Sequence, residues 1–197
     1  MVNVARVTLG KWHPSFREIE DTNLIHFLAE NGHWSPFAHP HLSFRIKAPI
    51  FVARQLAKTQ VGMVWNEVSR RYVDETPEFY RPELRRRAKG VKQGSLDEVV
   101  DIPTDQVFFS TDHALKTYNA LLLNDVAPEV ARSVLPQSMM TEWIWTGSLY
   151  GFARVCQLRL DSHAQKESRE IAKGILSVLK KDYPVSTHAL LPKYTEE

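Results

Sequence analysis

The segment 66–72 concentrates polar and charged residues in the order Asn-Glu-Val-Ser-Arg-Arg-Tyr. Ser69 stands between Glu67 and two arginines, Arg70 and Arg71. This grouping could present a hydroxyl, backbone N–H groups and two guanidinium groups together, which are the donors that a phosphate monoester requires. A surface turn with solvated arginines would have the same composition. The residues alone therefore leave both interpretations open.

A second cluster surrounds Arg159, which stands between the apolar residues Leu158 and Leu160. An arginine in an apolar setting requires a partner for its charge once it is partly buried. An anionic or carbonyl-rich ligand could supply that partner, and so could a salt bridge to Asp161 or Glu170. Both alternatives stay open at this point.

Two further candidates for chemistry are weak. His33, His39 and His41 have a spacing that loosely resembles a metal site, but they lack a convincing fourth ligand, so the sequence predicts no metal centre. Cys156 is the single cysteine and follows Val155 in a predicted helix. We expect a small buried side chain there instead of a nucleophile.

The composition is that of an ordinary globular protein, because 43% of the 197 residues are hydrophobic and 24% are charged. The net charge of +2 is too small to indicate nucleic-acid binding. No apolar run approaches the roughly 20 residues of a membrane-spanning helix, and the first residues lack the apolar core of a signal peptide. A single cysteine excludes an intrachain disulfide, so we expect a cytoplasmic protein. A G-x-G-x-x-G loop and a Walker loop are both lacking, so any dinucleotide must be bound in another way.

Helices and separated strands are expected to position these residues, which is the α+β class. Alternating apolar residues predict strands at 2–9 and 42–47, and β-branched and aromatic residues predict an extended segment at 139–146. One helix is expected to begin at a cap formed by Asp21-Thr22 and to run to Leu28, and another is expected to begin at Pro49 and to end near Gly62. Further helices are expected over 111–125, 128–135, 147–159 and 163–181. The last of these is expected to be capped by Asp161-Ser162. The basic segment 77–95 is expected to be an irregular, solvated excursion.

Six short motifs, in order along residues 33–165, resemble those of the flavin-dependent thymidylate synthases. The motifs are His33-x-Ser35-Pro36-Phe37-x-His39, Lys47-Ala48-Pro49-Ile50-Phe51-Val52-Ala53-Arg54-Gln55, Asn66-Glu67-x-Ser69-x-Arg71-Tyr72, Glu78-Phe79-Tyr80, Ala131-Arg132-x-x-Leu135-Pro136 and Leu158-Arg159-x-Asp161-Ser162-His163-Ala164-Gln165. Each motif alone is weak evidence. Six motifs in the right order, over roughly two thirds of the chain, are highly specific.

The resemblance implies both an activity and an architecture. Members of this family methylate dUMP to dTMP with the one-carbon unit of methylenetetrahydrofolate, FAD supplies the hydride, and NADPH reduces the flavin. They use no cysteine nucleophile, and they work as homotetramers with active sites shared between subunits. For this chain we therefore expect a single α+β domain over residues 1–197, with a small, mostly antiparallel sheet flanked by several helices. Nucleic acid and membrane partners are not expected.

The resemblance also assigns roles to individual residues. Arg159 corresponds to the arginine that binds the uracil ring, and a fixed cation there would stabilise the charge that develops during attack by the pyrimidine. The residues that the resemblance assigns to dUMP are Gln55, Lys58, Glu67, Ser69, Arg70, Arg71, Arg132 and Arg159. Those that it assigns to the flavin are Ser35, Lys58, Thr59, Gln60, Glu67, Ser148, Tyr150, Arg154 and His163.

This sequence departs from the family's pattern on the flavin side. The triplet 58–60 is Lys-Thr-Gln, where the family usually has Arg-His-Arg, and Ser148, Tyr150 and Arg154 stand where many members have Asn, Arg and Asn. The dUMP side is nearly intact. Two alternatives fit this pattern: a related flavin-dependent enzyme that installs another one-carbon group, such as hydroxymethyl, on a pyrimidine nucleotide, or a dUMP-binding homologue with weakened FAD binding.

Overall fold

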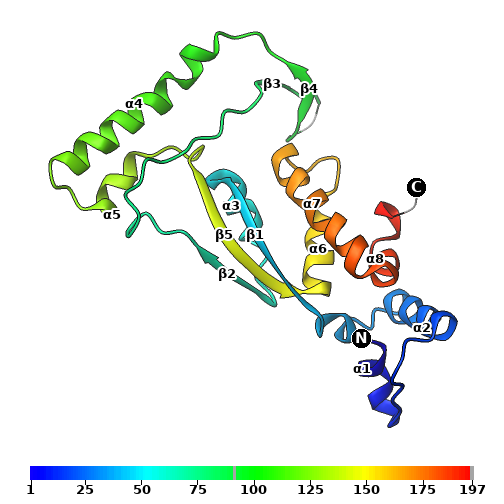
Figure 1. The fold of residues 1–197 in the computed structure, drawn as a ribbon. Helices are drawn as coiled ribbons and strands as arrows, with labels where there is room; N and C mark the ends of the chain where they lie inside the picture. Colours follow the sequence, from blue (N-terminus) through cyan, green and yellow to red (C-terminus); the bar gives the residue numbers. More distant parts are fainter. Residues whose placement is uncertain (91, 196–197) are drawn as a thin grey trace. The chain divides into compact units, whose positions relative to one another are not determined.

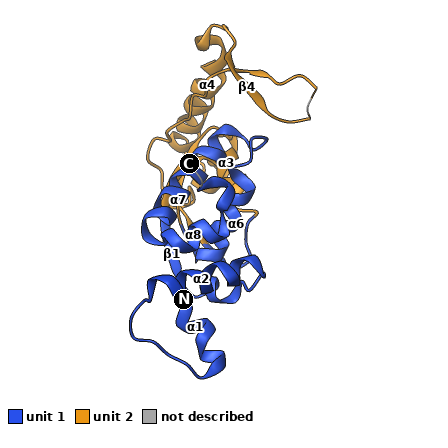
Figure 2. Cartoon of the chain, turned by 90° about the vertical axis from the view of Figure 1, so that its right-hand side faces the viewer, with its two compact units in different colours: residues 1–44, 59–64, 145–197 blue, residues 45–58, 65–144 orange. Residues whose placement is uncertain are grey.

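The computed structural model describes residues 1–90 and 92–195, which divide into two compact units built from separate parts of the chain. Unit 1 comprises residues 1–44, 59–64 and 145–195, and unit 2 comprises residues 45–58 and 65–144 apart from residue 91 (Figure 2). The sequence predicts that residues 1–197 form one domain. Whether the two units make up one domain stays a prediction. No helix in the described part of the chain is long and apolar enough to cross a membrane.

The main sheet has three strands in the order β1-β5-β2, namely β1 (His41–Pro49), β5 (Met140–Ser148) and β2 (Met63–Glu67) (Figure 1). Glu67 contacts Thr141 and Trp65 contacts Trp143. Residue numbers therefore fall along β5 as they rise along β2, which is the antiparallel arrangement. The strand predicted at 42–47 and the extended segment at 139–146 are confirmed as β1 and β5, and the α+β class is confirmed with them.

The helix predicted to follow Pro49 forms, because proline has extended backbone angles that suit the residue before the first helical turn (φ −67°, ψ 151°). This helix, α3 (Ile50–Leu56), ends well before Gly62, where a fade was predicted. Gly62 instead has a φ of +71°, a left-handed conformation that glycine adopts without strain, and β2 begins at the next residue. The sequence did not predict β2.

Unit 2 also contains a hairpin and a long helix. Its remaining elements are β3 (Arg85–Arg87), β4 (Ser95–Val99), α4 (Thr104–Leu123), α5 (Pro128–Ala131) and the 3-10 turn η3 (Arg132–Val134). The basic segment 77–95, predicted to be an irregular, solvated excursion, contains the short strand β3, which pairs antiparallel with β4. Gly90 and Gly94 have φ values of +77° and +114°, which only glycine adopts readily. The hairpin lies beyond the end of α4 at which this helix begins, and α5 follows the end of α4 at Leu123 (Figure 1).

Unit 1 is mainly helical. Its elements are α1 (Val2–Arg6), the 3-10 turn η1 (Val7–Leu9), α2 (Glu18–Glu30), the 3-10 turn η2 (Ser35–Ala38), α6 (Leu149–Arg159), α7 (Lys166–Asp182), α8 (Pro184–Leu190) and the 3-10 turn η4 (Pro192–Tyr194). α6 packs against α7, and α8 packs against both α2 and α7. Ala172, Ile175 and Leu179 are fully or nearly fully buried at helical spacing, so α7 presents one apolar face to this core.

The strand predicted at 2–9 is wrong, since α1 and η1 occupy these residues. A few alternating apolar residues define a period of two poorly over so short a segment. The helical turn instead directs the guanidinium of Arg6 to the carboxylate of Asp21, which is completely buried.

Three predicted helix boundaries are also corrected. α2 begins at Glu18 instead of at a cap formed by Asp21-Thr22, and α4 begins at Thr104 instead of near 111. α7 begins at Lys166 without a side-chain cap. Asp161, predicted to cap it, instead accepts a hydrogen bond from the backbone N–H of His163 at 2.8 Å.

Asp21 links α1 to the start of α2. Its carboxylate accepts hydrogen bonds from the Arg6 guanidinium and from the backbone N–H of Arg17 at 2.9 Å. The bond from Arg6 holds the pKa of Asp21 below its usual value, although burial alone would raise it. The ionised form of Asp21 is therefore favoured in the folded state.

We expect Asp21→Asn to lower the melting temperature by several degrees at neutral pH, because Arg6 would lose its buried partner. Since the pKa of Asp21 is depressed in the folded state, this stabilisation is complete above the unfolded-state value of about 3.9 and is lost as pH falls through the lower folded-state value. Thermal melts of both proteins should therefore differ by a constant amount down to roughly pH 5, begin to approach each other at about pH 4, and converge once the pH is below the folded-state pKa. Glu20→Gln, which breaks an exposed pair with Arg17 and leaves the Arg6–Asp21 pair in place, is the control and should change little. A gap that is independent of pH would contradict this account.

Candidate functional site

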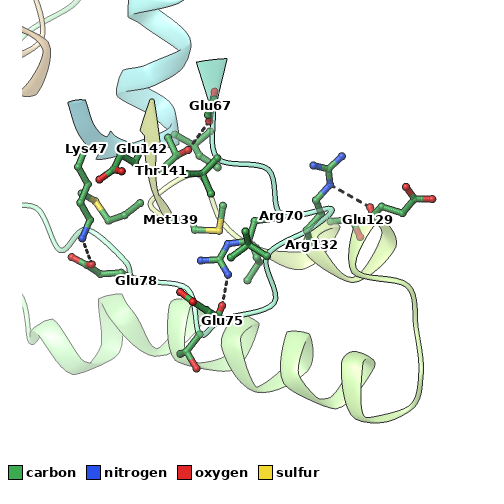
Figure 3. A pocket seen from close by; sticks show the side chains of 17 residues that line it. Lys47, Glu67, Arg70, Glu75, Glu78, Glu129, Arg132, Met139, Thr141 and Glu142 are labelled. Carbon is green, nitrogen blue, oxygen red and sulfur yellow. Dashed lines mark hydrogen bonds and ion pairs between the residues drawn. The ribbon is translucent and has the colours of Figure 1, made fainter. Parts of the chain in front are cut away.

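Unit 2 contains an open cavity of about 490 Å³, within the range of about 300–1,000 Å³ that is usual for small-molecule sites. Its wall is built from β1, the end of β2 with the turn that follows it, η3 and the start of β5 (Figure 3). The charged side chains that line it are Lys47, Glu67, Arg70, Glu75, Glu78, Glu129, Arg132 and Glu142. Such a wall suits a ligand that carries both an anionic group and hydrogen-bond donors.

Each cation of the cavity wall contacts an acceptor of the wall. Lys47 pairs with the carboxylate of Glu78 at 2.5 Å, and the Arg70 guanidinium donates to the backbone carbonyl of Glu75. Nε of Arg132 donates to the backbone carbonyl of Glu129 at 3.4 Å. A bound anion would replace these acceptors, and guanidinium groups are well suited to bind a phosphate through paired N–H groups.

The segment 68–72 forms a turn that holds the arginines at the cavity. The hydroxyl of Ser69 accepts from the backbone N–H of Arg71 at 3.3 Å, and the carbonyl of Ser69 accepts from the N–H of Tyr72 at 3.0 Å. Nε of Arg71 donates to the carboxylate of Glu129 at 3.1 Å. Ser69 and Arg71 therefore adjoin the cavity, while Arg70 lines it.

Glu67 lines the same cavity at the end of β2. Its two carboxylate oxygens have different donors: the hydroxyl of Thr141 at 2.6 Å and the indole N–H of Trp65 at 3.0 Å. Both oxygens keep further lone pairs that a ligand's donors can reach.

The cavity brings together part of the predicted dUMP set. Glu67, Arg70 and Arg132 line it, and Ser69 and Arg71 adjoin it as described above. Gln55 on α3 and Lys58 just after α3 belong to unit 2 but do not line the cavity, and Arg159 ends α6 in unit 1. The sequence did not assign Lys47, Glu78, Glu129, Thr141 and Glu142, although Lys47 and Glu78 occur in the quoted motifs.

Most of the predicted flavin residues belong to unit 1. The hydroxyl of Ser148 accepts from the backbone N–H of Gly151 at 3.1 Å and so caps α6. The ring of Tyr150 lies 6.0 Å from the ring of Trp34, which is 56% exposed. Arg154 is exposed and donates to Gln157 at 3.3 Å.

These groups are chemically suited to a flavin dinucleotide. An exposed indole beside a phenol offers a surface for a planar ring, and the exposed side chains of Ser35 and Arg154 can donate to a pyrophosphate. Thr59 and Gln60 also belong to unit 1, whereas Lys58 and Glu67 belong to unit 2.

His163 and Cys156 have local partners. Nδ1 of His163 lies 3.0 Å from the carboxylate of Asp161, and hydrogen bonds from the backbone and ring of His163 lower the pKa of Asp161. Burial raises the pKa of the Cys156 thiol to about 12, and its Sγ lies 3.7 Å from the carbonyl of Ala172. A protonated, buried thiol is a poor nucleophile, in agreement with the prediction for this residue. Within residues 1–90 and 92–195, no group of three His, Cys, Asp or Glu side chains could hold a metal ion.

Three comparisons with known proteins, by family model, by sequence and by structure, agree with one another. The family model of the thymidylate synthase complementing protein matches residues 1–185. The chain is 37% identical to a flavin-dependent thymidylate synthase of Thermosipho africanus, over 96% of this chain and 84% of that protein. It is 39% identical to one of Kosmotoga olearia, with the same two coverages. The crystal structure of the UMP/dUMP methylase PolB from Streptomyces cacaoi, bound with 5-Br dUMP, has a TM-score of 0.84 at 27% identity, covering 97% of this chain and 88% of that chain.

We expect Arg70→Ala to weaken binding of dUMP about 10-fold or more, because it deletes a charge-assisted donor from the cavity wall. Calorimetry should show no comparable loss with deoxyuridine, which lacks the phosphate. Lys116→Ala removes an exposed cation from α4 in the same unit and is the matched control. Equal losses for dUMP and deoxyuridine would exclude a phosphate contact by Arg70.

Proposed function

The chain belongs to the family of flavin-dependent thymidylate synthases, and from that membership we propose that it converts dUMP to dTMP with methylenetetrahydrofolate as one-carbon donor, FAD as hydride carrier and NADPH as reductant. The observation that carries this proposal is the cavity of unit 2, because Arg70, Arg132 and Glu67 all line it. Two of these side chains provide positive charge for a phosphate, and the third provides an acceptor for the nucleoside.

Within this proposal the residues have separate tasks. Arg70 and Arg132 bind the phosphate of dUMP, and Ser69 shapes the turn that presents Arg70. Arg159 faces the uracil ring and favours ionisation at N3, because a fixed cation stabilises the negative ring charge from which C5 attacks the one-carbon unit. The flavin, when bound, supplies the hydride that completes the methyl group.

We also propose a homotetramer whose active sites combine residues of several subunits. The cavity of unit 2 holds only part of the dUMP set, and Arg159 belongs to unit 1. Several large apolar side chains are more than half exposed, among them Trp12, Ile19, Phe109 and Leu123. Exposed apolar side chains of this size favour burial against another subunit.

One observation supports a variation of the flavin side. Ser148, which stands where many members have Asn, is 8% exposed, and its hydroxyl is engaged as the cap of α6. FAD would then be held by other groups, such as Tyr150 and Arg154. A weakened hold on FAD and transfer of a hydroxymethyl group are the two alternatives that this difference favours.

The proposed function is tested by the absorbance spectrum and by tritium release. We expect the purified protein to be yellow or to bind added FAD, and to release tritium from [5-³H]dUMP when NADPH and methylenetetrahydrofolate are present. Mass analysis of the nucleotide product separates dTMP from a hydroxymethyl product. A protein that binds dUMP but neither binds FAD nor releases tritium would be a binding homologue, which would overturn the proposal.

We expect Arg159→Ala to lower turnover by about 100-fold or more, because the ionised pyrimidine loses its fixed cation. The melting temperature of the variant is measured alongside turnover, so that a chemical role is separated from a structural one. Arg159→Lys keeps the charge but not the guanidinium geometry, so it should recover part of the rate. Lys181→Ala removes an exposed cation of α7 and serves as the control. Near-normal turnover of Arg159→Ala would exclude the catalytic assignment.

A further inference from the structure

Trp65 on β2 and Trp143 on β5 form a cross-strand stack inside unit 2. Their ring centroids are 4.3 Å apart and the ring planes differ by 16°. Trp143 is 1% exposed, whereas Trp65 is partly exposed. Aromatic pairs across antiparallel strands stabilise a sheet, and a buried ring fixes the orientation of the ring stacked on it.

The two indoles differ in what their N–H groups contact. The N–H of Trp65 donates to Oε2 of Glu67 at 3.0 Å. The N–H of Trp143 is buried and finds no acceptor among the residues that the structure describes. Only one indole of the stack therefore combines packing with a polar contact, and that contact is made to a residue of the cavity wall.

Thr141 completes the hold on Glu67. Its hydroxyl donates to Oε1 of Glu67 at 2.6 Å, and its side chain is buried in β5 (Figure 3). Each carboxylate oxygen thus has one donor, and the donors come from two different strands. A glutamate side chain has several rotatable bonds, and two such contacts select one orientation from the many that an exposed glutamate would otherwise sample.

The chemistry of the carboxylate defines what it can recognise. An ionised glutamate only accepts hydrogen bonds, so its free lone pairs require a donor on the ligand. In dUMP the donors are the sugar hydroxyl and the N–H of the pyrimidine, whereas the ionised phosphate would be repelled. Glu67 is thereby suited to the nucleoside, and Arg70 and Arg132 are suited to the phosphate.

We propose that Trp65 and Thr141 are positioning residues that orient the Glu67 carboxylate to accept a hydrogen bond from the nucleoside part of the substrate. This inference rests on the proposed function, because it takes dUMP as the ligand. Neither side chain contacts the substrate in this account; both act through Glu67.

The test uses two variants that remove a donor while keeping shape. Trp65→Phe keeps an aromatic ring for the stack and deletes the N–H, and Thr141→Val keeps the branched side chain and deletes the hydroxyl. Each should raise the KM for dUMP by about 3- to 10-fold while kcat stays within about 2-fold, as expected for loss of ground-state positioning. Calorimetry with dUMP should show the same loss of affinity without turnover.

The chain offers a matched control for each variant. Trp143→Phe makes the same change in the other ring of the stack, where the N–H has no acceptor in the described residues. Thr146→Val makes the same change on the same strand, where the hydroxyl contacts that of Ser43 at 2.8 Å instead of Glu67. Both controls should keep KM within about 2-fold of the unmodified protein. Controls that lose as much affinity as the test variants would assign the effect to packing and overturn the inference.

A double-mutant cycle isolates the route through Glu67. In a Glu67→Ala background, neither Trp65→Phe nor Thr141→Val should cause a further loss of dUMP affinity. If each adds its full loss there, Trp65 and Thr141 do not act through Glu67, and the inference fails while the proposed function stands. If the unmodified protein neither binds dUMP nor releases tritium, the proposed function fails and the inference fails with it.

Discussion

The antiparallel register of β5 between β1 and β2 is the constraint on which the cavity depends. Side chains along a strand alternate between two faces, so a shift of one residue would move every β5 side chain to the opposite face. The observed register places Thr141 against Glu67 on β2, and Glu142 within 2.7 Å of Arg45 on β1. Trp143 then meets Trp65, and a shift of one residue would break that stack. The same contacts that fix the sheet therefore fix the polar groups at its edge.

The arginines at the cavity contact acceptors of the protein that a ligand could replace. Glu129 joins two arginines, because its carboxylate accepts from Arg71 and its carbonyl accepts from Arg132. The Arg71–Glu129 pair is about half exposed on both sides, and exposed pairs of this kind contribute little stability. A ligand that drew Arg71 away from the Glu129 carboxylate would therefore cost the fold little. These contacts can order the arginines when no ligand is bound, and the arginines remain available to bind one.

Some elements of this structure could be predicted from the sequence, and others could not. The period of two in β1, the aromatic run of β5 and the proline before α3 were sufficient to place those elements. β2 was missed, because its sequence mixes Trp65 with polar neighbours and its pairing partner lies far along the chain. β3 was missed for the same reason, since three consecutive arginines form a strand only when β4 pairs with them. Sequence periodicity reports burial, and these strands are defined mainly by hydrogen bonds to a distant partner.

The candidate site divides in a similar way. Glu67, Arg70 and Arg132 were identified from motifs, and the cavity brings them together. Glu129 and Thr141 were not identified, because their relevance comes from the side chains that they meet: Arg71 is 58 positions from Glu129, and Glu67 is 74 positions from Thr141. A motif records which residues a family retains, whereas a contact between distant residues appears only in the folded chain.

The placement of the charged groups reflects what each kind of recognition requires. Attraction between an arginine and a phosphate falls slowly with distance, so it tolerates the freedom of a turn, and Arg70 lies in one. A hydrogen bond to a sugar hydroxyl or a pyrimidine N–H weakens within a few tenths of an ångström and a few tens of degrees. The acceptor for such a bond therefore requires a rigid support, and Glu67 has one in two strands, a buried threonine and a stacked pair of indoles. For the proposed dUMP ligand, the turn would supply affinity for the anion, and the sheet would supply discrimination among the nucleosides attached to it.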